Sequence, residues 1–331
     1  MKTLIFLLFG FLVIGVHSQE KKYVTVKKKV PLMGETFDIT VVAVNEELGY
    51  INIDEASAEI ERIEKLISSW DKDSETTKIN NNAGVKPVKV SLELFALIER
   101  AKQISELTDG AFDITYASVD KVWEFNGSMQ YLPTENEIRK SIINVGYKNI
   151  ILDKEKQTIF LKTKGTQISF DAIGKGYAVD KAKSLLVSKQ VVAGVINADG
   201  DITTWGTKAS GEKWLLGVAN PLSNYKIISW LPIVESSVAT TDIYEKYVNF
   251  KKQKFGHIIN PKSGKPVKTL KKATIFAKSA ELCDALATAV LVLGLEKGIA
   301  LINQLGGTEA IFIDANNILH KSNGVILDKL P

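Results

Sequence analysis

The sequence contains very little cysteine and histidine. Cys283 is the one cysteine among 331 residues, so no internal disulfide can form and a multi-cysteine metal or iron–sulfur site is excluded. The three histidines are His17, His257 and His320, and no His-Glu-x-x-His sequence occurs. Little room is therefore left for a zinc site.

A large charge of one sign is also lacking. The net charge is only +4, from 42 basic and 38 acidic side chains, which is too small a surplus to indicate a nucleic-acid binder. Hydrophobic residues make up 45% of the chain and charged residues 24%, which is ordinary globular composition and excludes wholesale disorder. No internal repeat or Pro/Gly/Ser-rich linker occurs. We expect residues 19–331 to form one catalytic unit with two lobes.

Long apolar runs are missing except at the N-terminus. After Lys2, the run Leu4–Val16 is too short for a comfortable membrane span and has the length of a signal-peptide core. We expect residues 1–18 to be a signal peptide; an uncleaved anchor is the alternative. The mature protein would then be soluble and exported, in the periplasm or on the outer face of the inner membrane. The basic residues at 21–29 indicate at most a peripheral membrane association.

The periodicity of apolar residues predicts both helices and strands, without strict alternation. Helices are expected at 54–67, 91–107, after Thr134, from about Tyr177, at 280–293 and at 295–304. Strands are expected at 34–44, 157–162, 166–170, 192–197, 213–219, 227–239, 244–250 and 309–314. This order predicts an α+β fold with mixed, largely antiparallel sheets and inserted helices.

The segment Asp284-Ala-Leu-Ala-Thr288 lies in an apolar helix that Ser279 can cap. Asp284 and Thr288 are four residues apart, so their oxygens share one face. A carboxylate on a mostly buried helix needs a partner. A hard divalent cation with a substrate phosphate would supply one; a structural aspartate bonded to backbone or to a lysine is the alternative.

A second segment, Ser169-Phe-Asp-Ala-Ile-Gly-Lys-Gly-Tyr-Ala-Val-Asp180, places Lys175 between two glycines. A strand at Gln167–Phe170 is expected to run into this lysine and then into a helix. Backbone N–H groups at a helix start, beside a cation, suit a phosphate. A glycine-rich turn with a surface lysine is the simpler interpretation.

Four further features are weaker. Thr108–Thr115 could present an aspartate to a ligand or simply form a turn after a helix. His257 opens a short apolar strand, where it could act as acid or base or be structural. The acids of Asn197-Ala-Asp-Gly-Asp201 are expected at a solvated loop tip. Trp70 could stack on a ring or pack in the core.

Taken in order, these segments resemble one family, the FAD:protein FMN transferases, or ApbE-like flavin transferases. The resemblance covers nearly all of the mature chain. It is carried by Met33–Thr36, Ser68–Asp71, Asp109–Thr115, Ala172–Asp180, Val238–Thr241, His257–Pro261 and Asp284–Thr288. Seven segments in one order are far more specific than any one of them.

The resemblance implies an enzyme that moves FMN from FAD to a threonine or serine hydroxyl of an acceptor flavoprotein and releases AMP. It implies Mg²⁺ or Mn²⁺ as cofactor, held by Asp284, Thr288 and the carbonyl of Ala172. The acceptors it implies are flavin-carrying subunits of membrane redox complexes or related exported flavoproteins. The FAD contacts it implies are Met33, Trp70, Ala111, Phe112, Asp113, Lys175, His257 and Ile258.

The proton of the acceptor hydroxyl needs a base, for which His257 is the first candidate and Asp284 the second. Two other functions stay open: a metal-dependent FAD pyrophosphatase that gives FMN and AMP, and an exported FAD-binding protein without turnover. The chain also departs from the family pattern at Ser169, Asp171, Asp199, Asp242 and Asn260. None of these belongs to the proposed metal set, but they could shift the balance between transfer and hydrolysis.

Overall fold

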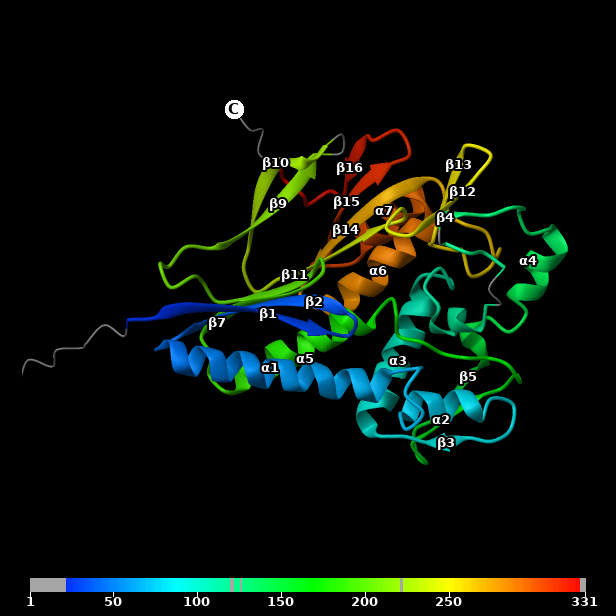
Figure 1. Ribbon diagram of the computed structural model, residues 1–331, viewed down its shortest axis with the longest axis horizontal. Coiled ribbons are helices and arrows are strands. Elements are labelled where there is room, and N and C mark those ends of the chain that lie inside the picture. Colours follow the sequence, from blue (N-terminus) through cyan, green and yellow to red (C-terminus); the bar gives the residue numbers. More distant parts are fainter. Residues whose placement is uncertain (1–21, 120–121, 126, 221–222, 328–331) are drawn as a thin grey trace, which may run out of the picture.

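The computed structural model describes residues 22–119, 122–125, 127–220 and 223–327 (Figure 1). The expected signal peptide, residues 1–18, lies outside these residues. Within the described part of the chain, no helix combines the length and the apolar character needed to cross a bilayer.

The centre of the molecule is an eight-stranded sheet in which every neighbouring pair is antiparallel. In spatial order its strands are β1 (Val24–Leu32), β2 (Glu35–Ala43), β7 (Ala193–Ala198), β8 (Asp201–Trp205), β11 (Ser237–Asp242), β14 (Leu270–Ala277), β15 (Glu309–Asp314) and β16 (Leu319–Lys321). Alternation along β2 buries Phe37, Ile39 and Val41 on one face. The sheet therefore has a face that helices must cover.

The sheet is narrowest in its middle, where β8 meets β11. Only two residue pairs join these strands, Ser237 with Thr203 and Val238 with Ile202, whereas nine pairs join β1 and β2. The hydroxyl oxygens of Thr203 and Ser237 lie 2.9 Å apart at this junction. The narrow pairing divides the sheet into two halves, β1–β2–β7–β8 and β11–β14–β15–β16.

Helices cover one face of both halves, as Figure 1 shows. Helices α1 and α5 pack on the first half, and α6 and α7 on the second. The helices are α1 (Glu46–Ile67), α2 (Glu75–Asn81), α3 (Leu92–Leu107), α4 (Glu135–Ser141), α5 (Gly174–Ser188), α6 (Ala280–Leu293) and α7 (Leu295–Gln304). Helix α5 also packs against α6. The two helices therefore connect the two halves of the sheet on its helix-covered face, next to the β8–β11 junction.

Smaller elements surround this frame. A hairpin of β9 (Trp214–Asn220) and β10 (Ser223–Ile233) packs on the opposite face of the sheet, through Trp214 and Ile233. Two small sheets and two 3₁₀ turns complete the described elements. They are β3 (Val88–Lys89), β6 (Thr158–Leu161) and β5 (Ile150–Asp153); β13 (Gln253–Gly256), β12 (Tyr247–Phe250) and β4 (Gly127–Ser128); and the turns Ile114–Ser118 and Tyr147–Asn149.

The α+β fold predicted from the sequence is confirmed, and most helix positions agree closely. The strand predicted at 166–170 is wrong: these residues form no strand, and the Asn80 side chain bonds to Ile168 where a neighbouring strand would pair. Its amide donates to the Ile168 carbonyl at 3.0 Å and accepts from the Ile168 N–H at 2.8 Å. The single strand predicted at 227–239 is also wrong, because β10 ends at Ile233 and β11 begins at Ser237.

Candidate active site between α5 and α6

The site is built where α6 approaches the start of α5. Asp284 lies on the second turn of α6 and is only 5% exposed. The Gly176 N–H donates to its Oδ2 at 3.2 Å. Gly176 is required here by close approach, because a Cβ at this position would lie 2.2 Å from the Ala280 carbonyl oxygen.

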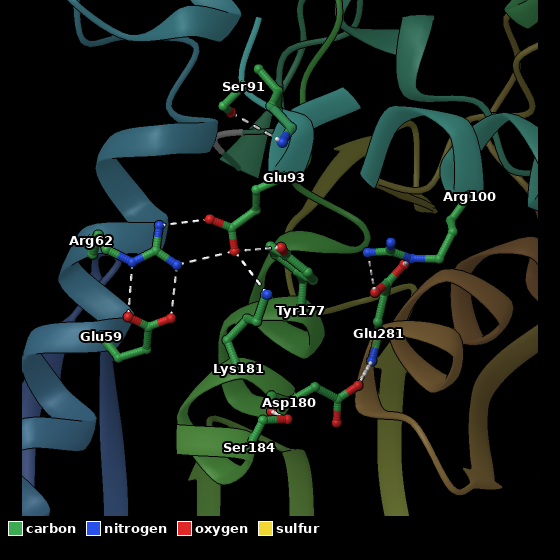
Figure 2. A network of polar contacts seen from close by, with 11 residues as sticks. Glu59, Arg62, Ser91, Glu93, Arg100, Tyr177, Asp180, Lys181, Ser184 and Glu281 are labelled. Carbon is green, nitrogen blue, oxygen red and sulfur yellow. Dashed lines mark hydrogen bonds and ion pairs between the residues drawn. The ribbon is translucent and has the colours of Figure 1, made fainter. Parts of the chain in front are cut away.

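A second contact from α5 fixes the beginning of α6. The Asp180 carboxylate accepts from the Ser279 hydroxyl at 2.8 Å and from the Ala280 N–H at 2.9 Å. It also accepts from the Glu281 N–H at 3.0 Å (Figure 2). These N–H groups belong to the first turn of a helix, where no intrahelical acceptor exists. Gly176 and Asp180 together set the position of Asp284 relative to α5.

Lys175, the second residue of α5, brings a positive charge to the same place. Its Nζ lies 3.6 Å from Oδ2 of Asp201, and its side chain is 29% exposed. Burial acts to lower the pKa of Lys175, but the carboxylates of Asp201, Asp284, Glu245 and Asp199 outweigh it and raise that pKa above its ordinary value. Lys175 is therefore a firmly charged cation among carboxylates, and not the surface lysine of the simpler interpretation.

Asp201 is the site residue that the sequence interpretation missed. It was expected at a solvated loop tip, but it is only 4% exposed. Burial raises its pKa to about 6, although Lys175 opposes the shift. The sequence did carry a signal: Asp201 opens β8, and alternation places it on the same face as the buried Thr203 and Trp205.

The Asp284 carboxyl is strongly perturbed. Burial raises its pKa well above the ordinary value, the Asp201 carboxylate adds to this, and Lys175 and the Gly176 N–H only partly oppose it. Its negative charge is thus poorly compensated within the protein. A bound cation would compensate it directly.

The residues around Asp284 offer the oxygen ligands that Mg²⁺ prefers. Thr288 follows one turn later on α6 and is partly exposed, and Ala172 lies just before α5. Residues 22–119, 122–125, 127–220 and 223–327 contain no group of three Asp, Glu, His or Cys side chains arranged to hold a metal. A cation here would therefore need carbonyl, hydroxyl and phosphate oxygens besides the carboxylate, and the set Asp284, Thr288 and Ala172 stays a prediction.

His257 follows β13 and has a defined ring orientation. Its backbone N–H donates to the carbonyls of Ile243 and Lys246, and its Nδ1 lies 3.3 Å from the Ile243 carbonyl oxygen. Because a carbonyl can only accept, the ring proton belongs on Nδ1, and Nε2 keeps its lone pair. The β11–β12 loop, which supplies these two carbonyls, also carries Glu245, whose carboxylate raises the pKa of Lys175.

Met33 lines a cleft between β1, β2 and α1, and Trp70 lies in the sequence between two other lining residues, Ser68 and Asp71. Met33 has a left-handed backbone (φ 52°), and its N–H donates to Glu64 at 3.2 Å. The cleft has a volume of about 710 Å³ and is lined by residues 31–36 and by Glu61, Glu64, Lys65, Ser68 and Asp71. The Met33 Cε lies 4.0 Å from the position of a Cβ built on Gly174, so the cleft adjoins the start of α5. Trp70 is 83% exposed, so the core-packing alternative for it is wrong.

The 111–113 segment turns its side chains inward. Phe112 is part of the core, and Asp113 is 8% exposed. Asp113 accepts from the N–H and hydroxyl of Thr115 at 2.8 and 2.6 Å and from the Tyr147 N–H at 2.7 Å. The Asp113 carboxylate is therefore occupied by hydrogen bonds to Thr115 and Tyr147 of the protein itself. Contacts of FAD with Ala111, Phe112, Asp113 and Ile258 stay predictions; Ile258 is half-buried and packs against the core of the second half.

Comparison with known proteins identifies the family of this chain. A model of the ApbE family matches residues 33–312. An FAD:protein FMN transferase of Klebsiella pneumoniae is 31% identical over 259 residues, covering 78% of this chain and 80% of the relative. An FAD:protein FMN transferase of Treponema pallidum is 28% identical over 289 residues, covering 83% and 80%.

Solved structures show the same architecture. The crystal structure of the ApbE protein of Thermotoga maritima superposes with a TM-score of 0.81 at 27% identity, over 91% of this chain and 97% of that one. The apo flavinyl transferase ApbE of Pseudomonas stutzeri has a TM-score of 0.80 at 23% identity, over 91% and 95%. The resemblance found in the sequence is confirmed: the chain belongs to the ApbE family of flavin transferases and is an enzyme of the transferase class.

Proposed function

We propose that this protein is a Mg²⁺-dependent FAD:protein FMN transferase that attaches FMN to a threonine or serine hydroxyl of an acceptor protein and releases AMP. The observation that carries the proposal is the junction of α5 and α6. There, a family match extending through both helices coincides with a buried carboxylate, Asp284, and a charged lysine, Lys175. This combination suits the diphosphate of a dinucleotide.

FAD would bind with its diphosphate at this junction. Lys175 would contact a phosphate oxygen with its ammonium group, since a cation beside a helix start favours phosphate. The cleft that adjoins Met33 would take a ring system, and the exposed Trp70 would stack on it. Asp284, Thr288 and the Ala172 carbonyl would hold the cation. When bound, Mg²⁺ would neutralise the charge that develops on the phosphates and align them.

The transfer balances as a displacement at phosphorus. The acceptor hydroxyl oxygen forms a bond to the phosphorus on the FMN side. The bond from this phosphorus to the bridging oxygen breaks, and AMP leaves with the electron pair. Nε2 of His257 is our candidate to take the hydroxyl proton, because its lone pair is free when Nδ1 is held by the Ile243 carbonyl.

We further propose that the enzyme works outside the cytoplasm, in the periplasm or on the outer face of the inner membrane. The support is the sequence of residues 1–18, which has a basic start and a short apolar run. Its acceptors would then be exported flavoproteins, including flavin-carrying subunits of membrane redox complexes.

The experiment mixes the protein, FAD, Mg²⁺ and a candidate acceptor domain and measures the mass of the acceptor. We expect a gain of one FMN less one water on a threonine or serine, together with one AMP. Asp284→Ala should abolish the transfer while circular dichroism shows a folded chain. Rapid AMP release without acceptor would instead indicate FAD hydrolysis, and FAD binding without any AMP would contradict both reactions.

A further inference from the structure

Oδ2 of the Asp201 carboxylate is buried and has no hydrogen-bond partner among the described residues. It is one of the few such side-chain oxygens in that part of the chain. The nearest cation is the Nζ of Lys175 at 3.6 Å, which is an ion-pair distance and too long for a hydrogen bond. A buried, unpaired carboxylate oxygen is unfavourable, so its presence needs an explanation.

The position of Asp201 is rigid. It opens β8 directly after a tight turn, in which the Gly200 N–H donates to the Asn197 side chain at 2.9 Å. A hydrogen bond also joins β8 to α5, because Lys183 of α5 donates to the Thr204 carbonyl of β8 at 2.8 Å. The distance between the backbone of Asp201 and that of Lys175 is therefore fixed by two elements that are bound to each other.

The charge of Asp201 opposes a direct role with the substrate. A carboxylate beside a diphosphate repels it, so Asp201 would weaken FAD binding if it acted on the phosphates alone. Its carboxylate faces the ammonium of Lys175, whose long side chain would otherwise be free to adopt several rotamers. The ion pair restricts this side chain to the region beside Asp284.

We propose that Asp201 is a positioning residue that holds the Lys175 ammonium group in place for a phosphate of the dinucleotide. The inference rests on the proposed function for the identity of the phosphate ligand, but not for the contact between the two side chains. Asp199 provides a matched control: it lies on the same turn, carries the same charge and is exposed.

The contact itself is tested by the reactivity of Lys175 in the full chain without FAD. Acetic anhydride modifies only the uncharged amine, and mass spectrometry of peptides gives the rate for each lysine. Asp201→Asn should make Lys175 react several times faster, because the ammonium loses its nearest counter-charge. Asp199→Asn should leave the rate within about twofold of the wild type, because the exposed Asp199 carboxylate acts only weakly on the charge of Lys175. An unchanged rate in Asp201→Asn would overturn the proposal.

The consequence for catalysis is tested by a double-mutant cycle with FAD, Mg²⁺ and acceptor. Asp201→Asn should lower kcat about tenfold in the wild-type background, with FAD affinity unchanged or tighter. In a Lys175→Met background it should change kcat less than twofold, since Asp201 acts through the lysine. Equal losses in both backgrounds would contradict positioning and indicate a structural role. Absence of transfer by the wild type would reject the proposed function, while the labelling experiment would still decide the contact.

Discussion

At the scale of single residues, the site holds two carboxylates that a protein selected only for stability would not bury. Asp201 and Asp284 are both nearly inaccessible, and burial raises the pKa of each. In their ionised form they oppose folding, and Lys175 compensates them only in part. Such locally unfavourable groups concentrate at functional sites.

The first prediction concerns stability and pH for Asp201→Asn. The folded pKa of Asp201 is about 6, above the value of about 3.9 in an unfolded chain. The protonated Asp201 carboxyl therefore contributes its full stability to the folded state below pH 4, and this stability is lost as the pH rises through 6. We expect Asp201→Asn to be more stable than the wild type at pH 7 by about 3 kcal/mol and equally stable near pH 3.5.

Urea unfolding in EDTA at both pH values measures this difference, and Asp199→Asn is the control. The unfolding free energy of the variant will still depend on pH, because Asp284 also titrates. The quantity to compare is therefore the stability difference between variant and wild type at pH 7, set against the same difference at pH 3.5. A variant that loses stability at pH 7 would show that Asp201 is a net stabilising group.

The second prediction concerns the base. Replacing His257 by alanine removes the proposed proton acceptor, Nε2. It leaves Lys175 and Asp284, which we place at the phosphates, unchanged. We expect kcat for FMN transfer to fall about 10²-fold or more, with FAD affinity by fluorescence changed less than tenfold. His320→Ala is the matched control, since His320 pairs with Asp314 at 3.1 Å near the sheet edge. Unchanged turnover in His257→Ala would exclude this residue as the base.

At the scale of elements, the packing of α5 on α6 decides where the site forms. The third prediction is that Gly176→Ala displaces α6, because the added Cβ would lie 2.2 Å from the Ala280 carbonyl oxygen and 2.9 Å from Cβ of Asp284. Backbone cannot yield as a flexible side chain does, so we expect a loss of about 2 kcal/mol or more and weaker binding of the cation.

Gly306→Ala is the control, since a Cβ there meets nothing within 4 Å. Thermal unfolding and titration with Mn²⁺ followed by electron paramagnetic resonance would measure both effects. Wild-type stability and Mn²⁺ affinity in Gly176→Ala would contradict the role given to the helix contact.

The sequence predicted the helices well because their local signals agree with their packing. Ser279 caps α6 through the Leu282 N–H, and Thr134 and Glu137 form the capping box at the start of α4. The strand at 166–170 failed because its pairing is with a side chain, Asn80, that lies 88 residues away. Local pattern carries no information about such a partner.

The site was predicted unevenly for the same reason. The spacing of Asp284 and Thr288 shows that they share a helix face. Local pattern singled out Lys175 and His257, and the family resemblance implied that they contact FAD. The burial of Asp201 depends on the packing of β8 against α5, which alternation along a five-residue strand only suggests. The inward orientation of Asp113 likewise depends on Tyr147, 34 residues away.

At the scale of the whole molecule, a network of ion pairs and hydrogen bonds centred on Glu93 connects helices α1, α3 and α5. Glu93 of α3 accepts from Arg62 of α1 and from Tyr177 of α5, and Lys181 of α5 lies 2.9 Å from it (Figure 2). These partners, Arg62 first, lower the pKa of Glu93 to about 2. The network therefore ties α5 to α1 and α3.

The fourth prediction is that Glu93→Gln destabilises the protein. A carboxyl whose folded pKa is lowered contributes stability above pH 4.5 and loses it as the pH falls towards 2. We expect a loss of about 2 kcal/mol at pH 7 and a much smaller loss near pH 2.5, measured by urea unfolding. Glu135→Gln, which removes an exposed pair with Lys265, is the control. Equal stability of Glu93→Gln and wild type at pH 7 would show that the network contributes nothing net.

The two halves of the sheet meet at the narrow β8–β11 junction, and each contributes one side of the site. Lys175 and Asp201 come with the first half, and Asp284 and Thr288 with the second. A diphosphate bound there would contact both halves.

A crystal grown with FAD and Mn²⁺ would test this arrangement most directly, because manganese scatters anomalously. We predict one anomalous peak bounded by the oxygens of Asp284, Thr288 and the Ala172 carbonyl, with the FAD diphosphate between it and Lys175. A peak elsewhere on the molecule, or FAD bound with its diphosphate away from this junction, would contradict the account.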